Sequence, residues 1–183
     1  MIPGPDLSTA RLDLAEGEPG SSCIDGMKLD DIIRSNLAQS AALFDELAPL
    51  AREDQRKPQS AMSLVARLAI QLKTHALALE RVLYTALLAA GDEPAVFALR
   101  GPHEHHALDV IVDKLLALRP GPELAAALAV ARRLFEQQAA VEERELLPVI
   151  ARALPADERD QLARDLVAEQ RRLRPRLLRQ VGG

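Results

Sequence analysis

The chain is poor in aromatic residues, and this shortage limits the kind of core that it can build. Its 183 residues include three Phe, one Tyr and no Trp. The core must therefore come mainly from Leu, Ala, Val and Ile, and Leu and Ala are good helix formers. Because almost no stretch alternates in the β-branched, period-two manner of a strand, we expect a single all-α domain.

Cysteine, long apolar runs and excess positive charge are scarce as well. The single Cys23 excludes an intrachain disulfide, which favours a reducing cytoplasm. No apolar run reaches the roughly 18 residues of a transmembrane helix, so we expect no membrane span. The net charge of -4 argues against a dedicated nucleic-acid binder. Arg far outnumbers Lys, which is typical of a GC-rich, bacterial genome.

Apolar residues recur at three- and four-residue steps, and this period predicts five helices. We place them at residues 28–50, 60–90, 102–118, 122–153 and 156–173, with loops at 51–60 and 91–101. Short turns between the later helices favour an up-down-up-down antiparallel four-helix bundle with an additional C-terminal helix. We expect the bundle domain to span 28–175, between a flexible tail at 1–27 and a basic tail at 176–183.

Several polar residues fall on the apolar seams of these helices. His75, His105 and Glu142 each lie on a different helix, and Asn36, Ser40 and Gln138 occupy similar positions. Burial without a partner costs roughly 2–7 kcal/mol for each polar group. The pattern therefore predicts either a metal site or a closed hydrogen-bond network, and it leaves both open. Two imidazoles and one carboxylate suit a single non-haem iron, or zinc with a water ligand.

The segments that carry these residues resemble the hemerythrin-like (HHE cation-binding) domain family over roughly Leu29 to Arg172. The second helix of that family typically carries His-x-x-x-Glu-Glu before Leu-Tyr-Pro, the third opens with Glu-His, and the fourth reads His-x-x-x-Glu-Glu before Leu-Leu-Pro. The matching residues are His75, Glu80, Leu83, Tyr84, Glu104, His105, Glu142, Glu143, Leu146, Leu147 and Pro148. The resemblance implies a four-helix bundle built around a non-haem iron pair.

The chain departs from the family pattern at three ligand positions. Asn36 stands where the first helix has a ligand histidine, Leu79 replaces the bridging glutamate, and Gln138 replaces the fourth-helix histidine. Leu cannot bridge cations, and Asn and Gln are weak oxygen donors for iron. The resemblance therefore implies a degenerate ligand set, in which Glu80 and Glu145 lie to the side of the expected ligands.

Two functional hypotheses follow. In the first, His75, His105 and Glu142 hold one iron or zinc ion, and the resemblance implies sensing or handling of iron, dioxygen or a related small molecule. In the second, no metal binds, and a network of polar residues fixes helix register in a regulatory or protein-interaction module. The network residues are Asn36, Ser40, Glu80, Gln138 and Glu145. A third hypothesis, an oxidase at the same site, needs a metal and an open channel, and the sequence shows neither, so it is the least favoured of the three.

Overall fold

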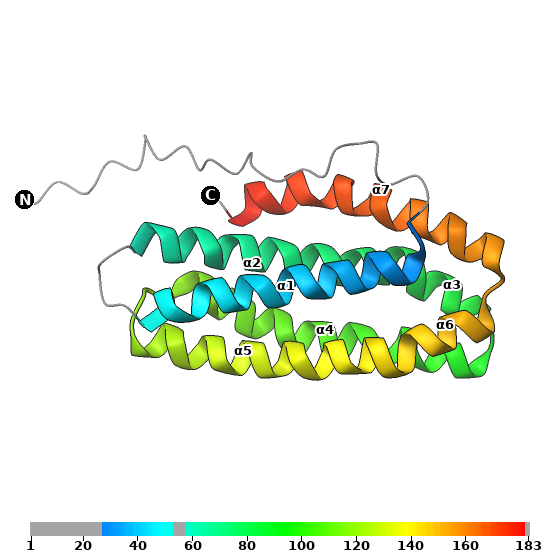
Figure 1. Cartoon of the computed structure of the whole chain (residues 1–183), viewed down its shortest axis with the longest axis horizontal. Coiled ribbons are helices and arrows are strands. Elements are labelled where there is room, and N and C mark those ends of the chain that lie inside the picture. Colours follow the sequence, from blue (N-terminus) through cyan, green and yellow to red (C-terminus); the bar gives the residue numbers. More distant parts are fainter. Residues whose placement is uncertain (1–26, 53–57, 182–183) are drawn as a thin grey trace, which may run out of the picture.

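Five helical rods make up the computed structural model, which is shown in Figure 1 and describes residues 27–52 and 58–181. The first rod is α1 (Leu29–Arg52), the third is α4 (Asp92–Ala117) and the fifth is α7 (Ala156–Val181). The second rod consists of α2 (Pro58–Ala78), the π-helical turn η1 (Leu79–Leu83) and α3 (Tyr84–Ala89). The fourth consists of α5 (Pro122–Val141), the π-helical turn η2 (Glu142–Leu146) and α6 (Leu147–Ala153). The all-α prediction is confirmed for the described residues, whereas residues 1–26, with Cys23, lie outside them.

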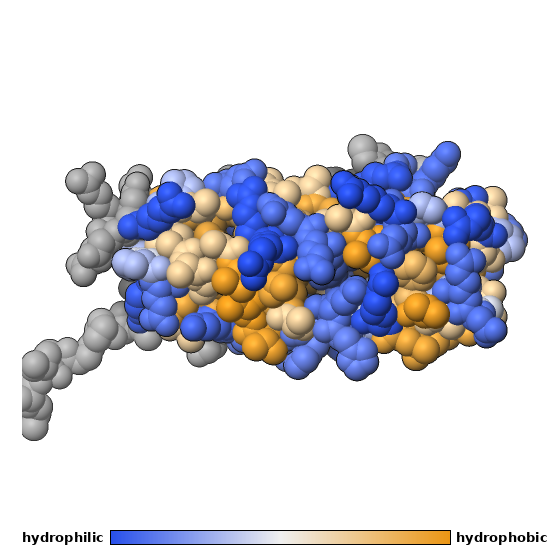
Figure 2. Space-filling view, turned by 90° about the horizontal axis from the view of Figure 1, so that it is seen from below, coloured by the Kyte–Doolittle hydropathy of each residue, from blue (hydrophilic) through white to orange (hydrophobic). Residues whose placement is uncertain are grey.

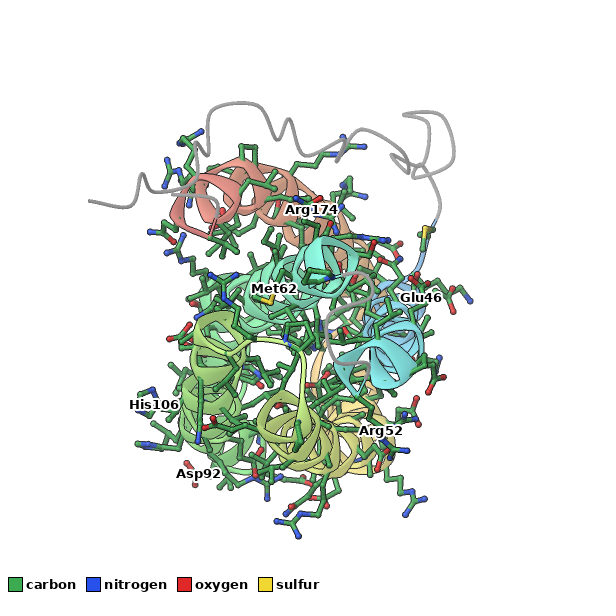
Figure 3. All side chains as sticks on the ribbon, turned by 90° about the vertical axis from the view of Figure 1, so that its left-hand side faces the viewer. Glu46, Arg52, Met62, Asp92, His106 and Arg174 are labelled. Carbon is green, nitrogen blue, oxygen red and sulfur yellow. The ribbon has the colours of Figure 1, made fainter. Side chains whose placement is uncertain are left out.

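The rods form a closed ring of packed neighbours with one helix outside it. Contacts join α1 to α2, α2 to α4, α4 to α5 and α5 back to α1. Their inward faces bury Leu, Ile, Val and Ala, together with a Phe44–Phe135 pair whose ring centroids are 5.3 Å apart. Helix α7 packs on the outside of α2, as the end-on view in Figure 3 makes clear. No described helix is long and apolar enough to cross a membrane.

The two π-helical turns change which residues face the core. A π-helical turn inserts one extra residue, so the inward face advances by one position. From the end of η1 onward the buried residues are Leu83, Tyr84 and Leu87, whereas Val82 and Ala86, which the regular period predicts, are only half-buried. At the end of η2 Leu146 is buried, whereas Glu145 is exposed. Glu145, which the metal-free hypothesis includes in the buried network, therefore lies on the surface.

Helix α4 begins ten residues earlier than predicted, and the expected loop at 91–101 is wrong. Only Ala90 and Gly91, the latter with φ 122°, separate α3 from α4, which starts at Asp92. Pro94 is tolerated because the first helical turn has no intrahelical N–H bonds to lose. Gly101 lies inside the helix, and only a residue without a side chain fits at this position, because an added Cβ would sit 2.4 Å from the Tyr84 ring. Close packing of α4 on α3 therefore requires this glycine.

The ends of two other helices differ from the sequence prediction. Helix α2 starts at Pro58 and not near Ser60, in agreement with the tolerance of Pro at a first helical position. Helix α7 was expected to end near Leu173 but continues through Pro175 to Val181. Leu173 and Leu177 are both buried, so packing on either side of Pro175 supports the helix despite the lost hydrogen bond.

Candidate functional site

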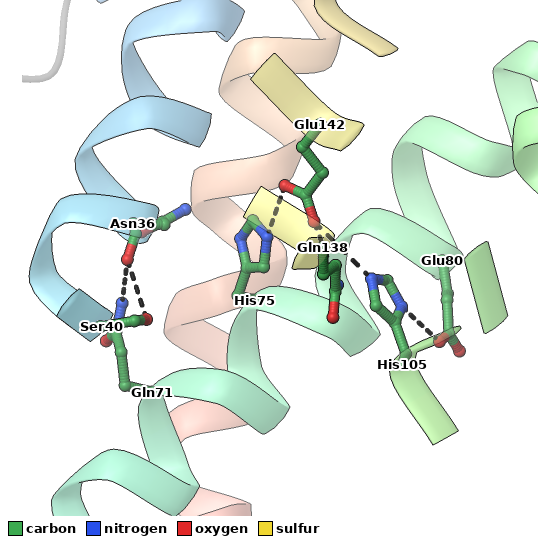
Figure 4. Close-up of polar contacts among 8 residues, drawn as sticks. All are labelled: Asn36, Ser40, Gln71, His75, Glu80, His105, Gln138 and Glu142. Atoms are coloured by element: carbon green, nitrogen blue, oxygen red, sulfur yellow. Dashed lines mark hydrogen bonds and ion pairs between the residues drawn. The ribbon is translucent and has the colours of Figure 1, made fainter. Parts of the chain in front are cut away.

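A buried hydrogen bond between His75 and Glu142 lies at the centre of the candidate site. His75 comes from α2 and Glu142 from η2, and their side chains are 5% and 4% exposed. Nε2 of His75 lies 2.9 Å from Oε2 of Glu142, as drawn in Figure 4. Because a carboxylate only accepts, Nε2–H of His75 donates this bond. Nδ1 of His75 is buried without a partner.

His105 extends this pair into a chain of four side chains. Its Nδ1 lies 2.8 Å from Oε1 of Glu80, and its Nε2 lies 3.9 Å from Oε1 of Glu142. The Tyr84 ring stacks on the imidazole, with centroids 5.8 Å apart and planes 12° from parallel. Figure 4 shows the resulting order, in which Glu142 lies between the two imidazoles and Glu80 lies beyond His105.

The protonation states of these contacting side chains depend on one another. Burial lowers the pKa of His105, but its contacts with the carboxylates of Glu142 and Glu80 outweigh burial and raise that pKa to about 9. Burial raises the pKa of Glu142, but the neighbouring His75 and His105 outweigh it and lower that pKa to about 2. At neutral pH the buried layer therefore contains an imidazolium at His105 and a carboxylate at Glu142.

Gln138, at the position where the resemblance implies a histidine, joins this set of contacts. Its Nε2 donates to Oε1 of Glu142 at 3.1 Å, and its Oε1 is buried without a partner. Leu79, at the position of the family's bridging glutamate, is fully buried and brings no polar atom. Four predicted residues, His75, His105, Gln138 and Glu142, are thus brought together in one contact chain.

Asn36 and Ser40 form a second polar group, between α1 and α2. The backbone carbonyl of Asn36 accepts from the hydroxyl of Ser40 at 3.0 Å and from Nε2 of Gln71 at 3.5 Å, whereas Nδ2 of its side chain is buried without a partner. Arg174 of α7 donates to Oε1 of Gln71 at 2.8 Å. No hydrogen bond in the described part of the chain joins this group to His75 or Glu142. Asn36 and Ser40 are therefore buried as predicted, but in a separate network.

The sequence reasoning missed Gln71 and Arg174 and misplaced Glu145. Gln71 precedes His75 by four residues and so shares its helix face, a signal that was available. Arg174 reaches the site only because α7 packs on α2, which no local pattern indicates. Glu145 lies on the surface, 3.4 Å from the guanidinium of Arg100, because η2 turns it away from the core. Glu80, expected to one side, is brought to His105 by η1.

The donor set does not suit the family's iron pair. Such a pair needs a carboxylate between two cations, and Leu79 offers no oxygen at that position. Among residues 27–52 and 58–181, no group of three or more His, Cys, Asp or Glu side chains is placed to hold a metal ion. The candidate ligands instead hydrogen-bond to each other, since His75 donates to Glu142 and His105 to Glu80.

Comparison with known proteins identifies the family. Searches of curated proteins and of solved structures gave no match. A family model described as the hemerythrin HHE cation binding domain matches residues 34–150, which is more than half of the polypeptide. The matched range includes the four contacting residues His75, Glu142, His105 and Glu80. The chain therefore belongs to the hemerythrin HHE cation-binding domain family.

Proposed function

We propose that this protein is a hemerythrin-like regulatory or protein-interaction module that works without an iron pair. We also infer that its four central rods follow the up-down-up-down antiparallel order expected from the short turns. The observation that carries the proposal is the contact chain from His75 through Glu142 and His105 to Glu80. In these contacts, His and Glu side chains, which are common metal ligands, interact with one another.

The charge of the layer supports this proposal. A buried carboxylate is stable only when a cation or several hydrogen bonds compensate it. Glu142 has both, because His75 and Gln138 donate to it and the protonated His105 faces it. The imidazolium thus supplies positive charge that a metal supplies in an iron centre.

A partner-binding role agrees with the surface of α4. Val96, Leu99 and Val110 lie on one side of this helix, and their exposed fractions are 55%, 64% and 58%. Figure 2 shows orange apolar patches that interrupt the charged surface on the face of the molecule turned toward the viewer. Apolar side chains exposed along one side of a helix offer apolar area that a protein partner could cover.

One feature favours a single metal ion as the second candidate. Nδ1–H of His105 donates to Glu80 while Nε2 is directed at Glu142, and a carboxylate behind an imidazole is the usual support of a metal-bound histidine. In that case His75, His105 and Glu142 would hold one iron or zinc ion, which would give the domain a means to bind dioxygen or to sense iron.

Metal analysis separates the two candidates. The purified chain is reconstituted with Fe²⁺ or Zn²⁺ under argon, desalted and analysed by plasma mass spectrometry. The positive control is the triple variant Asn36→His/Leu79→Glu/Gln138→His, which restores the three family ligands. We expect metal in the triple variant and far less than one equivalent in the unmodified chain. A full equivalent in the unmodified chain, lost in His75→Ala/His105→Ala, would reject the metal-free proposal.

A further inference from the structure

A cavity of about 350 Å³ borders the polar layer, and its walls are mainly apolar. Each of the five rods contributes an apolar residue to the lining, namely Leu37, Leu72, Leu108, Phe135 and Leu177. His75, His105 and Gln138 of the polar layer line it as well. This volume and this mixture of apolar walls with a few polar groups are typical of sites for small organic molecules.

Helix α7 completes this cavity from outside the bundle. Its Leu177 and Gln180 line the cavity, although α7 begins after the last residue that matches the family model. Leu177 is buried, whereas Gln180 and the lining residue His106 of α4 are exposed. Figure 3 shows His106 on the outer side of its helix. The cavity therefore opens to solvent between α4 and α7 and reaches inward to the polar layer.

Three lining side chains have polar atoms that are still unpaired. Within the described part of the chain, Nδ1 of His75, Nε2 of His105 and Oε1 of Gln138 are buried without a hydrogen-bond partner. Oε1 of Gln138 is an acceptor, because the amide nitrogen of this side chain donates to Glu142. Buried polar atoms in folded proteins nearly always have a partner. A ligand with a polar group at this end of the cavity would supply one.

A hydroxyl group fits these atoms whichever way the two histidines are protonated. An imidazole nitrogen donates when it carries a proton and accepts when it does not. An ammonium group can only donate and a carboxylate can only accept, so each suits only some of these states. A hydroxyl has one donor hydrogen and two acceptor lone pairs. It can therefore donate to Oε1 of Gln138 and accept from an imidazole N–H, or donate to an unprotonated imidazole nitrogen instead.

The ionisable side chains Lys73, Glu80 and Asp109 on the lining already have partners. Lys73 forms ion pairs with Asp109 and Asp113, and Glu80 is hydrogen-bonded to Nδ1 of His105. A charged ligand would thus leave water without a free counter-charge on these residues. Moving an unpaired charge into apolar surroundings costs far more free energy than moving a hydroxyl. The lining therefore favours an uncharged ligand over both an ammonium and a carboxylate.

We propose that the cavity binds an uncharged amphipathic molecule that has an apolar body and one hydroxyl group. Its apolar body would lie along Leu72, Leu108 and Phe135, and its hydroxyl would donate to Oε1 of Gln138. The inference rests on the proposed function, because it takes the unpaired atoms of the polar layer to be free of metal. The interaction module would then have a small-molecule ligand, which α7 helps to enclose.

Titration calorimetry with ligands of nearly equal size tests the head group. The chelator-treated protein is titrated with octan-1-ol, its isomer 1-methoxyheptane, n-octylamine and octanoate. The ether has the same atoms as the alcohol but no O–H donor, so it would bind at least as tightly if apolar burial alone drove binding. We expect octan-1-ol to bind at least about tenfold more tightly than each of the other three. No binding of octan-1-ol, or equal or tighter binding of any of the others, would overturn the proposal.

Two variants, each checked for folding by circular dichroism, locate the binding. Ala76→Phe places a ring into the cavity, because Ala76 lines it, and we expect it to abolish binding of octan-1-ol. The matched control Ala107→Phe adds the same ring at an exposed position of α4 and should bind as the unmodified chain does. Gln138→Met keeps the side-chain length but removes the acceptor, so octan-1-ol should lose its advantage over 1-methoxyheptane. Unchanged binding of octan-1-ol in folded Ala76→Phe, or an unchanged advantage in Gln138→Met, would overturn the assignment of the site.

The two proposals can fail independently. Stoichiometric metal in the unmodified chain would reject the metal-free function, and the chelator-treated protein would still report whether the cavity takes the alcohol. Absence of metal together with absence of octan-1-ol binding would retain the proposed function and reject the ligand site.

Discussion

His105 should make the stability of the fold depend on pH in the alkaline range. Its pKa is raised from 6.5 to about 9 in the folded chain, mainly by Glu142 and Glu80 acting against burial. A base whose pKa rises on folding stabilises the fold fully below its unfolded pKa and loses that contribution as pH rises through its folded pKa. The stabilisation is therefore present below pH 6.5 and is lost as pH rises to about 9 and beyond. The gap corresponds to about 3 kcal/mol.

Urea unfolding of the metal-free protein across this pH range measures the effect. The free energy of unfolding of the unmodified chain should fall by about 3 kcal/mol as His105 loses its proton. His105→Gln should lack this fall, because it has no titrating ring. His103→Gln is the matched control, since His103 lies two residues away on the same helix and is exposed.

The difference between the unmodified chain and each variant removes groups that titrate in all three proteins, such as Cys23. If the curve of His105→Gln runs parallel to that of the unmodified chain, the buried imidazolium does not exist and the charge argument for the layer fails. If His103→Gln removes the dependence instead, the titrating histidine has been wrongly assigned.

Three further substitutions test separate parts of the structure by urea unfolding. Glu142→Gln should cost about 3–5 kcal/mol, because it removes the enclosed carboxylate between the two imidazoles and leaves the His105 cation only the partly exposed Glu80. Glu143→Gln at the exposed neighbour should stay within about 0.5 kcal/mol. Gln138→Leu should cost about 1–3 kcal/mol by removing a donor to Glu142, and an unchanged midpoint would contradict a buried network. Gly101→Ala should destabilise by about 1–3 kcal/mol through its clash with Tyr84, although the same change in an open helix stabilises by about 1 kcal/mol; stabilisation would therefore refute the close packing.

The helical period predicted the number of rods and most of the buried seam because burial follows a local rule. His75, His105 and Glu142 fall at inward steps of a regular helix, and all three are buried. The period could not reveal the π-helical turns, since one inserted residue changes neither composition nor helix propensity. Those turns move Glu145 to the surface and bring Glu80 to His105. The polar partners of the site were therefore less predictable than its buried members.

Contacts between distant segments account for the remaining differences. Gly101 and Pro102 read locally as loop residues, but Gly101 serves close packing against Tyr84 inside α4. The ion pairs of Lys73 and the bond from Arg174 to Gln71 join residues 36 to 103 positions apart. Such pairs depend on how whole helices dock, and the local pattern of a single sequence does not determine that docking.

The composition of the polar layer supports the proposal that it is stable without a metal. Glu142 is the fully enclosed carboxylate, and the protonated His105 balances it, while Glu80 is partly solvated. A glutamate at position 79 would add a second enclosed negative charge beside Glu142, which already engages the two imidazoles, and a bound cation would neutralise it. The neutral Leu79 therefore does more than remove one ligand: it removes the excess charge that draws a cation into a buried site. On this argument the single change Leu79→Glu should raise metal affinity even before the two missing histidines are restored.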